Sequence, residues 1–148
     1  MKAYRFFALF IALEVVIQAM AIAFAVFGMS NFIQNDGGVV DKALIDSQDA
    51  DFTGVIGYPI HFLNGMLIGL LALLFLITSF FAKVAGGTRD AAIIVVLVVV
   101  EIFLGTIGGD LPILGPLHAL NAFAILFMAL GAAKRATESA TASDPATG

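Results

Sequence analysis

Residues 59–65 read PIHFLNG, and residues 116–122 read PLHALNA. Proline, histidine, leucine and asparagine coincide in the two stretches, and the other positions are apolar or small. Each stretch opens a long apolar segment, and proline in the first turn of a helix costs no hydrogen bond. The repeat therefore predicts two helices that begin in the same way, each with one histidine near its start.

Four apolar segments make up most of the 148-residue chain, at about 6–28, 60–82, 91–108 and 117–133. The chain is 61% hydrophobic and 12% charged, whereas soluble domains are about a quarter charged. Several of these segments reach the ~20 residues that cross a bilayer as a helix. A segment in lipid must satisfy its backbone hydrogen bonds internally, which favours helices. We therefore predict an all-α membrane protein, a four-helix up-down bundle over residues 1–133.

The charges predict the orientation of the four segments. Basic residues favour the cytoplasmic side of a membrane, and six of the seven lie at the termini or between the second and third segments. We therefore expect the plasma membrane as the location, with both termini in the cytoplasm, and residues 134–148 as a disordered cytoplasmic tail. The six basic residues are Lys2, Arg5, Lys83, Arg89, Lys134 and Arg135.

The loop between the first and second segments is acidic, with Lys42 as its basic residue. Its aspartates lack the spacing, the glycine and the final glutamate of a calcium-binding EF-hand. Val39, Val40, Leu44 and Ile45 are spaced to form a short amphipathic turn that could lie on the membrane surface. We expect a solvated outer loop rather than a metal site.

A weaker match extends the repeat, because residues 15–18 (VVIQ) correspond to residues 98–101 (VVVE) in the segments that precede each histidine. The chain is therefore predicted to be two tandem helical hairpins, related by a pseudo-twofold axis along the membrane normal. The second and fourth helices would be diagonal neighbours in the bundle. His61 and His118 would then face each other near the outer surface.

Each residue of the motif has a predicted role. A histidine and the residue four places later share a helix face, so Gly65 and Ala122 would leave room beside the imidazoles for a flat group. Asn64 and Asn121 would bridge helices or bond a ligand. The structural alternative is that the histidines only hydrogen-bond neighbouring helices, although ionisable groups within membrane spans are usually functional.

The residue types narrow the choice of metal. Zinc sites use three or four protein ligands, and the chain has two histidines and no cysteine. Haem iron needs only two axial ligands from the protein. We therefore predict one haem b held by His61 and His118. Glu101 is a candidate to orient an imidazole through Nδ1. For Glu14 and Gln18 we favour interhelical hydrogen bonding over a proton relay.

Histidines at the starts of the second and fourth segments, followed by small and aliphatic residues (His61, Gly65 and 69–71; His118 and Ala122), resemble one four-helix half of the haem A synthase family. That family has two such halves, each with a histidine pair on the outer side, so the resemblance implies that His61 and His118 are axial haem ligands. Tyr58 stands where the catalytic half has an acidic residue, so the resemblance is to the haem-holding scaffold. The layout is also similar to small four-span membrane families of unknown function.

The sequence thus favours a small membrane b-type cytochrome, an electron carrier or subunit rather than a stand-alone enzyme. Its expected partners are a quinol or a larger respiratory complex, and the sequence leaves self-association open. The net charge of −4 and the lack of a basic run argue against nucleic acid as a partner. The alternatives are a haem-free accessory subunit of a larger complex and an enzyme or carrier in which Glu101 and the histidines move protons on quinones or other lipids.

Overall fold

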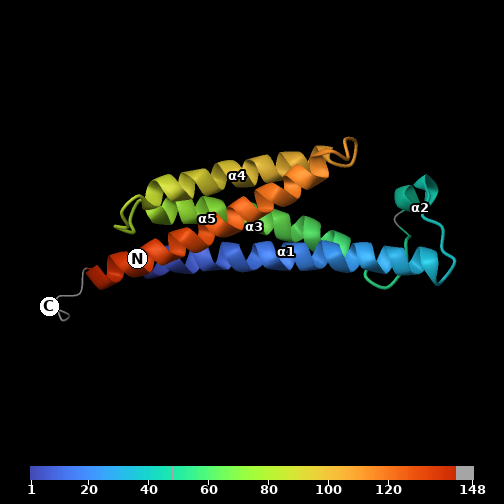
Figure 1. The fold of residues 1–148 in the computed structure, drawn as a ribbon, viewed down its shortest axis with the longest axis horizontal. Coiled ribbons are helices and arrows are strands. Elements are labelled where there is room, and N and C mark those ends of the chain that lie inside the picture. The colour runs from blue at the N-terminus through green and yellow to red at the C-terminus, as the bar shows by residue number, and fades with distance from the viewer. Residues whose placement is uncertain (48, 143–148) are drawn as a thin grey trace. The chain divides into compact units, whose positions relative to one another are not determined.

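The computed structural model describes residues 1–47 and 49–142, which form helices joined by turns and loops, without strands (Figure 1). Four of the helices are long and apolar enough to cross a membrane. The predicted all-α membrane fold is therefore confirmed. The helices are α1 (Lys2–Gln34), α2 (Lys42–Ser47), α3 (Gly57–Ser79), α4 (Gly87–Ile107) and α5 (Leu114–Ala142).

Helices α1 and α5 extend beyond the predicted apolar segments. At the end of α1, the Gln34 side chain donates to the Ser30 hydroxyl at 2.6 Å, and this bond stabilises the last turn of the helix. Helix α5 continues to Ala142, so residues 134–142 of the predicted disordered tail are helical. These residues contain no glycine or proline, and Lys134 lies 3.8 Å from Glu138 one turn later. Residues 143–148 of that tail lie outside the described residues.

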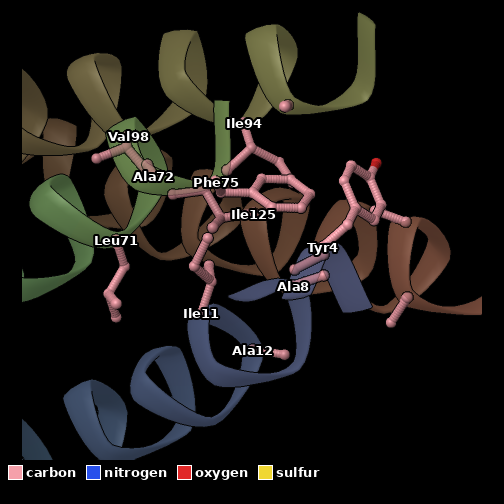
Figure 2. Close-up of a cluster of buried hydrophobic side chains, with 14 of the residues drawn as sticks. Tyr4, Ala8, Ile11, Ala12, Leu71, Ala72, Phe75, Ile94, Val98 and Ile125 are labelled. Carbon is pink, nitrogen blue, oxygen red and sulfur yellow. The ribbon is translucent and has the colours of Figure 1, made fainter. Parts of the chain in front are cut away.

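The chain divides into two compact units, residues 1–15 with 66–148, and residues 16–65. The core of the first unit joins the start of α1 to α3, α4 and α5 (Figure 2). The rings of Tyr4 and Phe75 pack with their centroids 4.5 Å apart. The core is otherwise aliphatic, and many large apolar side chains on the outer faces are exposed, which suits a lipid environment. Fully buried large residues of this core include Tyr4, Ile11, Phe75, Ile94 and Ile125.

Polar contacts hold together the end of this unit that contains the start of α1. The Tyr4 hydroxyl donates to the Gly87 carbonyl oxygen at 3.1 Å. Arg135 Nε donates to Oδ2 of the buried Asp90 at 2.6 Å. These bonds join the start of α1, the start of α4 and the last part of α5. Five of the six basic residues that predict the cytoplasmic side lie on these same segments, and Lys83 lies in the connection between α3 and α4.

The second unit contains the last part of α1, the outer loop with α2, and the start of α3. Helix α2 forms within the predicted amphipathic turn, although Val39 and Val40 precede it. Asp41 Oδ1 accepts from the backbone N–H of Leu44 at 2.9 Å, as an N-cap does. Phe32 and Phe52 stack with their centroids 5.6 Å apart, which holds the loop against α1.

Candidate functional site

Near the start of α5, His118 bonds to α4. Its Nδ1 lies 3.2 Å from the carbonyl oxygen of Glu101 and 3.3 Å from Oε1 of the same residue. A carbonyl oxygen can only accept, so Nδ1 carries the proton in this bond. In the neutral ring the lone pair is then on Nε2. A hydrogen bond at one ring nitrogen is typical of histidines that bind a metal through the other nitrogen.

Asn121, one helical turn after His118, completes this cluster. Its Nδ2 donates to the carbonyl oxygen of Leu97 at 2.8 Å and to Oε2 of Glu101 at 2.7 Å. The Glu101 side chain is thereby held between the amide and the imidazole. The sequence predicted that Asn121 bridges helices or bonds a ligand and that Glu101 orients an imidazole through Nδ1. In the structure Asn121 bonds α4, and Glu101 Oε1 lies 3.3 Å from His118 Nδ1.

The second unit contains the same arrangement around His61. Its Nδ1 lies 3.1 Å from the carbonyl oxygen of Gln18. Asn64, which is 8% exposed, donates to Oε1 of Gln18 at 2.9 Å. The expectation that Gln18 forms interhelical hydrogen bonds is confirmed, since these bonds join α1 to α3. His61 therefore also carries its proton on Nδ1.

The two clusters use corresponding residues of the repeat. Gln18 and Glu101 are the last residues of the matching stretches 15–18 and 98–101. The backbone carbonyl oxygen of each accepts from the histidine of its cluster, and its side-chain oxygen accepts from the asparagine. In both clusters the asparagine follows the histidine by three residues. The sequence repeat is therefore also a repeat of contacts.

The small residues have different neighbours from those that the spacing suggested. A Cβ at Gly65 would lie 3.2 Å from Nε2 of Gln18, so the Gln18 amide occupies the space beside this glycine. Ala122 packs against the apolar core. Gly105 instead adjoins His118, because a Cβ there would lie 3.1 Å from the ring carbon Cε1. Gly105 could have been found from the sequence, because it follows Glu101 by four residues and so shares its helix face.

The donor set decides which metal centres these residues fit. No group of three or more histidine, cysteine, aspartate or glutamate residues that could hold a metal ion occurs within residues 1–47 and 49–142. A site made only of protein ligands, such as a zinc centre, therefore has no support there. Iron in a porphyrin takes four nitrogens from the macrocycle, and two imidazoles with protonated Nδ1 supply the type of axial ligand that it needs.

Comparison with known proteins adds no relative. The chain matches no protein-family model and has no significant match among curated proteins or solved structures.

Proposed function

We propose that this protein is a small membrane b-type cytochrome in which His61 and His118 are the axial ligands of one haem. The supporting observation is the duplicated cluster, in which each Nδ1–H is bonded to a backbone carbonyl at 3.1 or 3.2 Å. Such a bond fixes the tautomer and the ring orientation of a metal-binding histidine. When bound, the haem would supply one-electron redox chemistry.

The remaining residues of the clusters position the ligands. Asn64 and Asn121 donate to the side-chain oxygens of Gln18 and Glu101, and so bond each histidine-bearing helix to the helix that offers the carbonyl. With two histidine ligands both axial positions are filled, which favours electron transfer over oxygen binding. We propose a quinol or a respiratory complex as electron partner, and the plasma membrane with cytoplasmic termini as the location.

A haem-free accessory subunit is the second candidate, and one observation favours it. Asn64 joins α3 to α1 and Asn121 joins α5 to α4 through direct hydrogen bonds between protein atoms. Side-chain hydrogen bonds of this kind hold membrane helices together. In that case the histidines would have a packing role only, and the protein would have no visible absorption.

The test is a dithionite-reduced minus air-oxidised absorption spectrum of the full chain, purified in detergent from cells supplied with haem. We expect a sharp α band that is lost in His61→Ala and in His118→Ala. Phe62→Ala and Leu120→Ala are matched controls. These side chains are near the histidines in sequence, are 67% and 65% exposed, and do not belong to the two clusters. A haem-supplied wild type without a band would overturn the cytochrome proposal and leave the accessory subunit.

A further inference from the structure

The second unit contains a cavity of about 700 Å³ between the last part of α1, the loop with α2 and the start of α3. Its lining side chains include Leu44 from α2, Phe52 from the loop, and Tyr58 from the first turn of α3. Small-molecule sites in proteins have ~300–1,000 Å³ and a mostly apolar lining with few polar groups. The cavity therefore has the size and character of a site for an apolar ligand.

One wall of the cavity is held by close backbone packing. The segment of residues 53–57 lies directly on α1, because a Cβ on Gly28 would overlap the carbonyl oxygen of Thr53. Gly57 makes a similar approach to the carbonyl of Ala21, and Gly54 has a φ of 98°, which side chains rarely tolerate. These contacts fix this wall of the cavity against α1.

The polar group of the cavity is the Tyr58 hydroxyl, the sole polar side chain among the described lining residues. It donates to Sδ of Met29 at 3.5 Å. A thioether is a weak acceptor, so the hydroxyl can exchange it for a ligand carbonyl at little cost. The site thus offers a ligand one hydrogen-bond donor within an apolar, aromatic lining.

The charges around the cavity select a neutral ligand. No ionisable group other than this phenol lines it within the described residues. The Lys42 ammonium of the surrounding loop is paired with Asp46 at 2.7 Å, and the other loop charges are negative. Fatty acids and anionic lipid headgroups would lack a cationic partner and would meet this negative potential. The acidic residues of the loop are Asp36, Asp41, Asp46, Asp49 and Asp51.

We infer that this cavity binds the ring of a lipid-soluble quinone, with Tyr58 donating to a ring carbonyl. A quinone is neutral, planar and apolar, and carries the acceptor that the hydroxyl requires. Tyr58 precedes His61 by three residues, so the two side chains share a face of α3. Electron exchange between quinone and haem rests on the proposed function, whereas quinone binding does not.

Calorimetric titration of the detergent-solubilised full chain tests the inference, with a decyl-substituted 1,4-benzoquinone as the probe and decylbenzene as the comparator without carbonyls. We expect saturable binding of one benzoquinone per chain and weaker binding of decylbenzene. Tyr58→Phe should weaken benzoquinone binding about fivefold, as loss of one neutral hydrogen bond does, and leave decylbenzene unaffected.

A matched pair of variants tests the position. Val40 lines the cavity, whereas the neighbouring Val39 does not and is 72% exposed. Val40→Phe should therefore weaken binding at least as much as Tyr58→Phe does, and Val39→Phe should leave it unchanged. Equal effects of Val40→Phe and Val39→Phe on binding would place the ligand elsewhere and overturn the inference.

The same titration on protein prepared without haem separates this inference from the proposed function. We expect unchanged benzoquinone binding there, because no lining residue is a proposed haem ligand. Equal affinity for benzoquinone and decylbenzene, with no effect of Tyr58→Phe, would show a site for an aliphatic chain and overturn the inference. A lack of saturable binding would also overturn it, whether or not haem is present.

Discussion

His118 donates from Nδ1 to the backbone carbonyl oxygen of Glu101 at 3.2 Å, and this bond joins the start of α5 to α4. His61 forms the corresponding bond with Gln18 at 3.1 Å. Because the acceptor is a main-chain atom, the imidazole orientation does not depend on which side chain stands at position 18 or 101. This explains how glutamine and glutamate can occupy equivalent positions in the two clusters while each histidine makes the same bond to a backbone carbonyl.

Under the proposed function, replacing the side chains beside the histidines should therefore leave haem bound. In Gln18→Ala and Glu101→Ala the backbone carbonyls remain, so we expect the α band to persist at the wild-type stoichiometry of haem. The measurement is the reduced-minus-oxidised spectrum of each purified variant, compared with His61→Ala and His118→Ala. Loss of haem in Glu101→Ala alone would show that the carboxylate, rather than the carbonyl, holds His118.

Asn121 should contribute to the stability of the helix pair α4 and α5. Its side-chain amide donates to two groups of α4, the carbonyl oxygen of Leu97 at 2.8 Å and Oε2 of Glu101 at 2.7 Å. Hydrogen bonds between membrane helices average about 0.6 kcal/mol and reach about 1.7 kcal/mol. We expect Asn121→Ala to lower the free energy of unfolding by about 1–2 kcal/mol, measured by denaturation of helical structure with sodium dodecyl sulfate. Leu120→Ala is the control, because the Leu120 side chain is 65% exposed, and an equal loss in the two variants would contradict this prediction.

The buried Asp90 should depend on Arg135 for its stability. Its side chain is 1% exposed and lies 2.6 Å from Arg135 Nε, whereas Arg89 is 74% exposed and 3.6 Å away. Removing one partner of a buried ion pair typically costs about 3–5 kcal/mol. Because Arg135 is itself 37% exposed, we expect Arg135→Ala to fall near the lower end of that range.

Arg89→Ala is the matched control for this pair and should change the free energy of unfolding by less than about 1 kcal/mol, as exposed pairs do. The double variant Asp90→Leu with Arg135→Met should recover most of the loss, because it leaves no unpaired buried charge. The same detergent denaturation measures all three. Equal losses in the two arginine variants would contradict the assignment of Arg135 as the main partner.

The close packing on α1 should make Gly28 sensitive to a single methyl group. Gly28→Ala would overlap the Thr53 carbonyl oxygen, so the 53–57 segment must move. We expect a loss of about 1–3 kcal/mol, typical of overpacking, with faster proteolysis of the outer loop. Gly115→Ala is the control, since a Cβ there meets nothing within 4 Å. Equal proteolysis of the two variants would show that the segment does not rest on α1.

The predicted orientation can be measured with single cysteines, because the chain contains none. A membrane-impermeant maleimide added to intact spheroplasts should label Val39→Cys in the outer loop. It should label Thr141→Cys, near the end of α5, only after the membrane is permeabilised. The reverse pattern would invert the topology predicted from the basic residues.

Hydropathy and local pattern predicted most of the fold. The four long apolar segments indicate membrane-spanning helices. Lipid offers no hydrogen-bond partner to backbone N–H and C=O groups, so these groups must bond to one another within each helix. The proline in each PIHFLNG-like stretch predicts a helix start, and α3 and α5 begin two residues before Pro59 and Pro116. The end of α5 was missed because residues 134–142 are polar, and polarity alone does not distinguish an exposed helix from a disordered tail.

By itself the sequence determined that the chain has four long apolar helices, a sided distribution of basic residues and a duplicated histidine motif, because these follow from composition and from spacing along one segment. Only the tertiary structure decided which atoms the histidines bond, that Gly105 rather than Gly65 adjoins an imidazole, and that the loop with α2 lines a cavity beside Tyr58. The physical reason is that these features depend on contacts between residues distant in the chain, and helical spacing places residues only within their own helix.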